Sequence, residues 1–123
     1  MGITRSICNV GAFAAALSLA CPLAAEDSSP LKTGNDLLQT CTDTSNLVMI
    51  TGCIGFISGV SRGTAAALET VNNRQFFCVP LGADNGQLTD IVVKWLRDHP
   101  EMRHHDATGL VIVALRGAFP CPP

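Results

Sequence analysis

The feature that most restricts how this chain can fold is a regular series of glycines within residues 46–71, a segment of almost no charge. The glycines recur at steps of three, four and four, at Gly52, Gly55, Gly59 and Gly63. This spacing places them along one face of an α-helix. Each glycine inside a helix costs about 1 kcal/mol relative to alanine, so close packing must recover roughly 3–4 kcal/mol. The pattern therefore predicts a central helix whose glycine face packs against another backbone, either on the last helix or across a dimer.

Two other structures compete for the same segment. A buried strand would use its Ile, Val, Phe and Thr residues, but glycine weakens strands as well. A membrane span needs about 20 apolar residues, and the apolar run 47–60 is shorter than that. We therefore prefer the helix of a folded domain and expect no membrane span.

The first 25 residues have the pattern of a cleaved signal peptide. Arg5 is a short basic start, Val10–Ala20 is the apolar centre, and Leu23–Ala25 is an acceptable cleavage site. The alternative is lipoprotein processing before Cys21. Removing 25 of the 123 residues leaves 98, enough for one domain over residues 26–123.

The cysteines of the mature chain indicate an oxidising compartment. Cys8 and Cys21 leave with the signal peptide, and an even number remains: Cys41, Cys53, Cys78 and Cys121. In a small exported chain this set predicts two disulfides. A zinc site is the alternative, but no C-x-x-C pair occurs. We expect no metal and no cofactor.

The charge balance argues against nucleic acid as a partner. All ten acidic residues lie after residue 25, whereas Arg5 is lost from the eight basic ones, so the mature net charge is −3. Binding to phosphates needs a basic face. We therefore expect no nucleic-acid partner.

Three further helices are predicted around the glycine-rich one. Residues 34–42 follow a capping-box-like Thr33 and Asp36, residues 85–98 follow Asp84, and residues 107–119 follow Asp106. Four helices joined by short loops predict a small all-α domain stapled by two disulfides. Hairpins of neighbouring helices would bring Cys41 near Cys53 and Cys78 near Cys121. We favour that connectivity over the other two, which remain open.

The most polar stretch of the mature core is the elbow between the last two helices, residues 98–106. It contains the side chains that we expect to meet a partner: Asp98, Glu101, Arg103, His104 and His105. A loop held on a rigid scaffold is a common place for binding residues, and a narrow projection suits a cleft. In the alternative interpretations the elbow merely ends a helix and the partner meets residues 68–76, or the histidines bind a metal. Adjacent histidines share no regular helix face, which disfavours the metal.

The sequence shows no recognisable catalytic arrangement. Every mature cysteine is assigned to a disulfide, and the serines lack a nucleophile-elbow context. The glycines of residues 52–63 form no phosphate loop because no lysine follows them. A triad assembled only in space stays open as an alternative, but we expect a protein that is not an enzyme.

Five motifs follow one another along the mature chain: T-G-N-D-L-L-Q-T-C (33–41), C-I-G-F-I-S-G-V (53–60), F-C-V-P (77–80), Q-L-T-D-I-V-V-K-W-L-R-D-H-P-E (87–101) and A-L-R-G-A-F-P-C (114–121). In this order they resemble the Rap/Tai-type immunity proteins, which protect bacteria against peptidoglycan amidases delivered by type VI secretion. Phe56 stands where the family's G-Y-I motif has tyrosine. Ser61 and Arg62 follow where an acidic residue is common.

The resemblance implies a periplasmic, helical, disulfide-containing homodimer that blocks the substrate cleft of a cognate amidase effector. Two alternatives come from other classes. One is a periplasmic protein on the same scaffold that binds a different partner. The other is an acid-stress chaperone, in which the three elbow histidines would gain charge as the pH falls through about 6.5.

Overall fold

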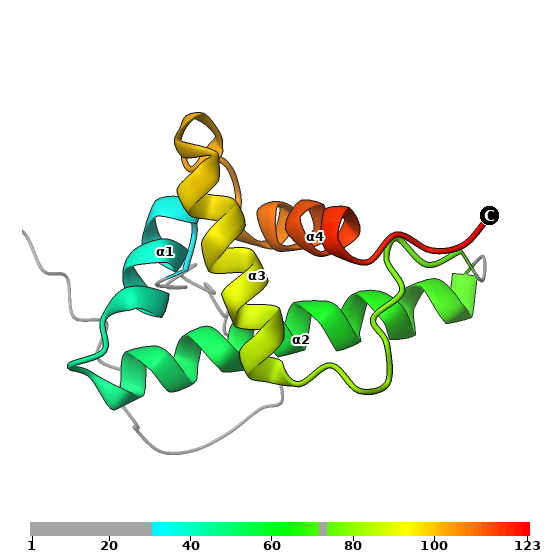
Figure 1. Ribbon diagram of the computed structural model, residues 1–123, viewed down its shortest axis with the longest axis horizontal. Coiled ribbons are helices and arrows are strands. Elements are labelled where there is room, and N and C mark those ends of the chain that lie inside the picture. Colours follow the sequence, from blue (N-terminus) through cyan, green and yellow to red (C-terminus); the bar gives the residue numbers. More distant parts are fainter. Residues whose placement is uncertain (1–30, 72–73) are drawn as a thin grey trace, which may run out of the picture.

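The computed structural model describes residues 31–71 and 74–123, which form four α-helices and no β-strand. The elements are α1 (Gly34–Thr42), α2 (Leu47–Val71), α3 (Asn85–Asp98), a 3-10 turn η1 (Pro100–Met102) and α4 (Ala107–Ala118). In Figure 1 the long helix α2 forms the base, and α1, α3 and α4 lie over one side of it. The predicted all-α class is confirmed. The predicted signal peptide lies outside the described residues.

The helices begin at the residues that the capping patterns indicate. Thr33 and Asp36 form a complete capping box at α1, in which each side chain accepts a hydrogen bond from the other residue's backbone N–H. Asp84 caps α3 by accepting from the N–H of Gln87 at 2.8 Å, and Asp106 caps α4 by accepting from Gly109 at 2.8 Å. These bonds satisfy N–H groups that have no partner inside a helix.

One apolar core joins all four helices. Its members are the buried side chains on the facing sides of the helices and one loop aromatic: Leu37, Cys53, Ile57, Phe77, Leu88, Val92, Leu96, Ala107, Leu110, Val111, Ala114 and Leu115. On α3 and α4 they recur at the three- and four-residue steps of a helical face. Both helices are therefore amphipathic, with one side in the core.

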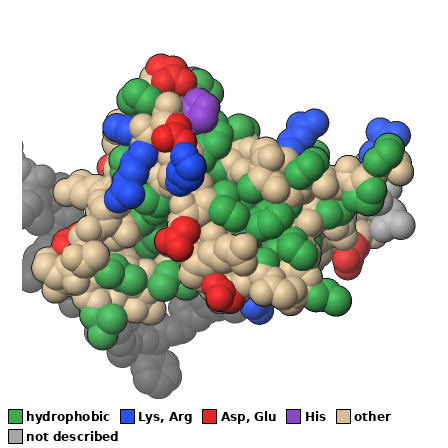
Figure 2. All heavy atoms as spheres, in the orientation of Figure 1, with side chains coloured by type: hydrophobic (Ala, Val, Ile, Leu, Met, Phe, Trp, Pro, Cys, Tyr) green, Lys and Arg blue, Asp and Glu red, His purple; other side chains and the backbone are tan. Residues whose placement is uncertain are grey.

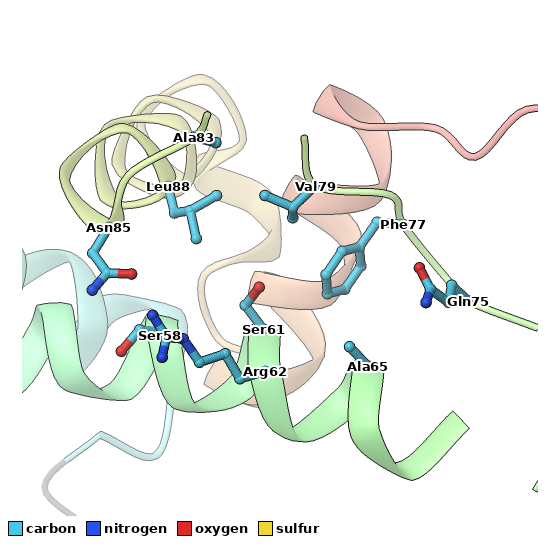
Figure 3. Close-up of a pocket in the computed structure, with 10 residues that line it drawn as sticks. All are labelled: Ser58, Ser61, Arg62, Ala65, Gln75, Phe77, Val79, Ala83, Asn85 and Leu88. Carbon is cyan, nitrogen blue, oxygen red and sulfur yellow. The ribbon is translucent and has the colours of Figure 1, made fainter. Parts of the chain in front are cut away.

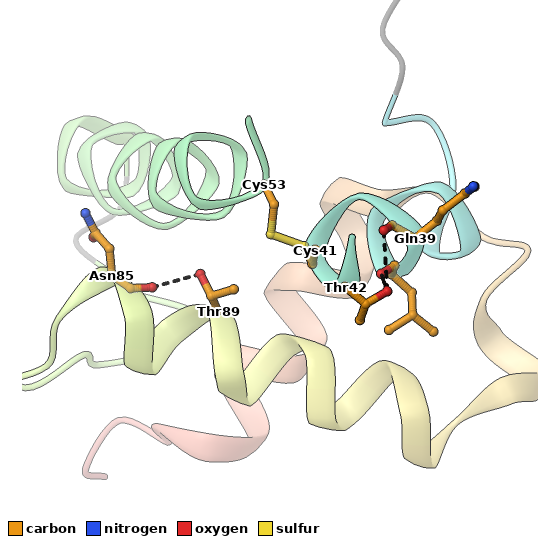
Figure 4. The surroundings of a disulfide bond; sticks show 7 residues. Gln39, Cys41, Thr42, Cys53, Asn85 and Thr89 are labelled. Atoms are coloured by element: carbon orange, nitrogen blue, oxygen red, sulfur yellow. Dashed lines mark hydrogen bonds between the residues drawn. A yellow bond between two sulfur atoms is a disulfide. The ribbon is translucent and has the colours of Figure 1, made fainter. Parts of the chain in front are cut away.

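Both predicted disulfides are present. Cys41–Cys53 joins α1 to α2, as Figure 4 shows, and closes a separation of 12 residues. Cys78–Cys121 fastens the loop before α3 to the C-terminal tail, across a separation of 43 residues. The backbone N–H of Cys78 also donates to the carbonyl of Phe119 at 2.8 Å. Each closed loop stabilises the fold by roughly 3–4 kcal/mol in the chain-entropy account.

The predicted packing of the glycine face on the last helix is wrong. All four glycines are exposed, and a Cβ added at any of them would meet nothing within 4 Å in the described residues. The side of α2 that enters the core instead carries Cys53 and Ile57, which are 1% and 0% exposed. The glycine face, together with Leu47 and Val48, is thus not covered by any other part of residues 31–71 and 74–123.

One described helix, over the stretch Leu47–Glu69 of α2, is long and apolar enough to cross a membrane. Length and composition alone are weak evidence, because core helices of folded domains meet the same criteria. Here Cys53 and Ile57 lie in the shared core, and Cys53 is bonded to α1. We therefore treat α2 as a helix of the folded domain whose outer face needs another cover.

Candidate partner-binding site

The elbow between α3 and α4 projects from one end of the molecule. It consists of residues 98–106, with the turn η1 at its centre. Figure 2 shows acidic, basic and histidine side chains gathered on this projection, whereas apolar and uncharged surface dominates the region beside it. The structure thus brings the predicted partner-binding residues together on one protruding surface.

Arg103, one of the residues expected to meet a partner, instead turns its side chain toward α3. Its Nε donates to the carbonyl of Leu96 at 2.6 Å and its Nη2 to the carbonyl of Arg97 at 3.0 Å. These carbonyls belong to the last turn of α3, which lacks partners within the helix and carries the negative end of the helix dipole. Arg103 is therefore half-buried and holds the elbow against α3.

The elbow is also bonded to the start of α1. The N–H of Asn35 donates to the carbonyl of Arg103 at 2.9 Å, and the N–H of Gly34 donates to that of His105 at 3.1 Å. An isolated antiparallel bridge pairs Thr33 with Asp106. Backbone bonds to the start of α1, together with the Arg103 side-chain bonds to α3, leave the elbow little freedom, so its exposed side chains stand on a fixed frame.

Gly34 makes this approach possible. A Cβ at that position would lie 2.5 Å from Cδ1 of Leu110 and 3.1 Å from both the Cα and the carbonyl oxygen of Arg103. The sequence analysis did not identify this contact. Its signal was present, since a glycine directly after an N-capping threonine is a poor helix former and needs a packing reason.

The base of the elbow is set by two local interactions on α3. Nζ of Lys94 lies 2.6 Å from the carboxylate of Asp98, and this hydrogen bond lowers the pKa of Asp98 below its ordinary value. The ring of His99 stacks on Trp95 with centroids 4.2 Å apart, and its Nδ1 lies 2.9 Å from the Trp95 carbonyl. Asp98 is thus already paired.

Three predicted residues remain fully available to a partner. Glu101, His104 and His105 are exposed, and the two histidine rings lie against each other with centroids 4.0 Å apart. Together they offer a carboxylate and two imidazoles on a narrow, rigid support. Such groups can donate and accept hydrogen bonds inside a partner's cleft.

The site contains no catalytic arrangement within the part of the chain that the structure describes. All four described cysteines are in disulfides, and no group of three or more histidine, cysteine or acidic side chains is placed to hold a metal among residues 31–71 and 74–123. The elbow is a protruding polar loop on a helical scaffold that two disulfides hold together, and loops of this kind are a common place for binding residues.

Comparison with known families then identifies the chain further. Residues 33–121, well over half of the sequence, match the Rap1a immunity proteins. The chain belongs to the Rap1a immunity protein family, whose members are periplasmic, non-enzymatic inhibitors of type VI amidase effectors. The match favours this class over the acid-stress chaperone. No curated protein and no solved structure gives a match.

Proposed function

We propose that this protein is a periplasmic immunity protein that blocks a cognate peptidoglycan amidase effector with its elbow. Family membership supports the inhibitory class. The observation that carries the assignment of the site is the double anchoring of the elbow, by Arg103 to the end of α3 and by Gly34 and Asn35 of α1. A loop already held in one conformation loses little entropy when a partner binds it.

Within this site the residues have two separate tasks. Glu101, His104 and His105 are the exposed groups that meet the amidase. Arg103 positions them through the carbonyls of α3, and Asp98 remains paired with Lys94 at the base. Blocking a cleft requires shape and hydrogen bonds but no chemistry from the inhibitor.

The test is inhibition of the purified cognate amidase acting on peptidoglycan. The elbow variant is Glu101→Ala with His104→Ala, which removes two exposed side chains and leaves Arg103 in place. We expect it to inhibit at least ten-fold more weakly, because one lost hydrogen bond to a charged group costs about 1.5–3 kcal/mol. Disulfide content and thermal melting confirm that the variant is folded.

The matched control alters the alternative surface, residues 68–76, at two exposed positions. Like the elbow variant, Arg74→Ala with Phe76→Ala removes one charged side chain and one side chain with a ring. Asn72 and Asn73 of that segment lie outside the described residues. The control should inhibit like the parent. Loss of inhibition only in the control would move the site to residues 68–76, and full inhibition by both variants would disprove the elbow site.

We also propose that a second copy of this chain covers the glycine face of α2. Among the described residues, no atom lies within 4 Å of a Cβ added at any glycine of this face, and Leu47 and Val48 on the same helix are each 79% exposed. Exposed apolar surface of this kind commonly marks an interaction site. Two such helices could approach closely, because the glycines have no side chains to separate them. A homodimer would thereby offset the helical cost of the glycines.

Sedimentation of the oxidised protein tests the dimer. Gly59→Leu places a bulky side chain on the glycine face and should convert the dimer into a folded monomer. The matched control is Gly117→Leu on α4, where an added Cβ also meets nothing within 4 Å. It should remain a dimer. A Gly59→Leu protein that sediments like the parent would show that the glycine face is not the interface.

A further inference from the structure

A cavity of about 280 Å³ lies far from the elbow, between α2, the loop before α3 and the first turn of α3. Its lining residues are Ser58, Ser61, Arg62, Ala65, Gln75, Phe77, Val79, Ala83, Asn85 and Leu88. One water molecule occupies about 30 Å³ in the liquid, so this volume corresponds to about nine water molecules. The cavity is therefore large enough for a small organic molecule.

The lining is divided into a polar and an apolar end. Figure 3 shows Ser58, Arg62 and Asn85 turned toward the same end, while Phe77 and Val79 line the other. Leu88 points into the space between them, and the hydroxyl of Ser61 rises into it from α2. A ligand that fits both ends has one polar group and a short apolar part.

The polar end favours a negatively charged group. The guanidinium of Arg62 is the one formal charge among the lining residues. Within the described residues, neither Arg62 nor Ser61 has a side-chain hydrogen bond or ion pair, and the Asn85 amide has none either. Their N–H and O–H donors therefore face the cavity without an acceptor. A carboxylate would satisfy several of them at once.

We propose that this cavity binds a small carboxylate carried on a short apolar chain. The carboxylate lies at Arg62 and Asn85, beside Ser58, whose hydroxyl already donates to the carbonyl of Gly55 at 3.2 Å. The chain lies against Phe77 and Leu88, which are 4% and 5% exposed. Because Arg62 itself is exposed, solvent screening limits its contribution and the affinity is modest. The site is separate from the inhibitor function, since the cavity and the elbow lie at opposite ends of α3.

The experiment is a titration of the oxidised mature protein followed by the amide signals of the lining residues in NMR. Butanoate is the probe, and butanamide is its uncharged counterpart. We expect saturable shifts of the cavity signals with butanoate, on the order of millimolar affinity, and at least ten-fold weaker binding of butanamide. N-acetylalanine, titrated in the same way, tests whether the carboxylate of a peptide C-terminus is accepted as well as that of a free acid.

Two variants decide the assignment. Arg62→Gln should weaken butanoate binding at least ten-fold, whereas Arg116→Gln, which removes an exposed positive charge on α4, should leave it unchanged. Ala65→Leu, which adds bulk at the lining, should abolish binding and keep the fold. Equal binding of butanoate by the Arg62→Gln and parent proteins would overturn the proposal. So would equal affinities for butanoate and butanamide, or shifts that do not saturate.

Discussion

Replacing Gly34 by alanine tests whether the close contact between α1 and the elbow holds the molecule together. The new methyl group would lie 2.5 Å from Cδ1 of Leu110 and 3.1 Å from two backbone atoms of Arg103. Leu110 is 3% exposed and has little space into which to move. The elbow is also held by backbone bonds to α1 and by side-chain bonds from Arg103 to α3. The methyl group must therefore push the first turn of α1 and the elbow apart.

The expected loss follows from two opposing effects. Overpacking a tight contact costs about 1–3 kcal/mol, and removing a helical glycine returns up to about 1 kcal/mol. The net destabilisation is thus about 1–2 kcal/mol, which corresponds to a fall in the melting temperature of roughly 5–15 °C for a domain of this size. Urea unfolding of the oxidised protein measures the free energy, and thermal melting measures the temperature.

The matched control is Gly117→Ala on α4, where a Cβ meets nothing within 4 Å. It should leave stability unchanged or raise it by up to about 1 kcal/mol. If Gly34→Ala were as stable as the parent and inhibited the amidase equally well, the tight anchoring of the elbow to α1 would be refuted. If Gly34→Ala loses more inhibition than its fraction of unfolded protein accounts for, the position of the elbow itself contributes to inhibition.

Three further predictions concern covalent state, pH and the positioning of the elbow. The mature protein should contain no titratable thiol when denatured without reductant, and reduction should abolish cooperative unfolding, since each disulfide contributes roughly 3–4 kcal/mol; two or more free thiols per chain would contradict the pairing. Hydrogen bonds from the Thr33 side chain and backbone hold the pKa of Asp36 below its ordinary value of 3.8. The ionised Asp36 carboxylate therefore stabilises the folded state fully above that pH, and this contribution is lost as the pH falls through the lower pKa of the folded state. Thr33→Ala should therefore flatten the acid limb of the stability curve, measured by urea unfolding between about pH 2 and 6, and an unchanged limb would argue against the capping box. Arg103→Gln should weaken inhibition and increase hydrogen exchange of the elbow amides, whereas Glu101→Ala should weaken inhibition without changing exchange.

Much of the scaffold could be predicted from the sequence because its signals are local. Thr33, Asp84 and Asp106 are capping residues whose partners lie three positions away, and each is observed in that role. The disulfides followed from the same helix boundaries, since helices of known length place Cys41 and Cys53 at a shared end. Short-range chemistry was sufficient in these cases.

The orientation of α2 could not be predicted in the same way. Apolar or small residues surround this helix. Cys53 and Ile57 mark one face and Gly55 and Gly59 mark another, and both pairs have the same spacing of four residues. Periodicity identifies a helix but does not choose between two apolar faces. The packing of three other helices makes that choice, and it places the glycines outside.

The inward turn of Arg103 was hidden for a related reason, and it affects how the elbow can serve an inhibitor. A charged residue in a polar loop is usually solvated, but the unpaired carbonyls at the end of α3 offer this side chain two acceptors. The frame of the elbow therefore depends on Gly34, Arg103 and Asp106, none of which needs to touch the partner. Glu101, His104 and His105 contribute little to that frame and can be exchanged without refolding the loop. If the partner meets the exposed side chains as proposed, specificity for a different amidase can change at those positions while the stability of the projection is retained. The loop is held by backbone groups and by the Arg103 side chain, and not by the side chains of Glu101, His104 and His105.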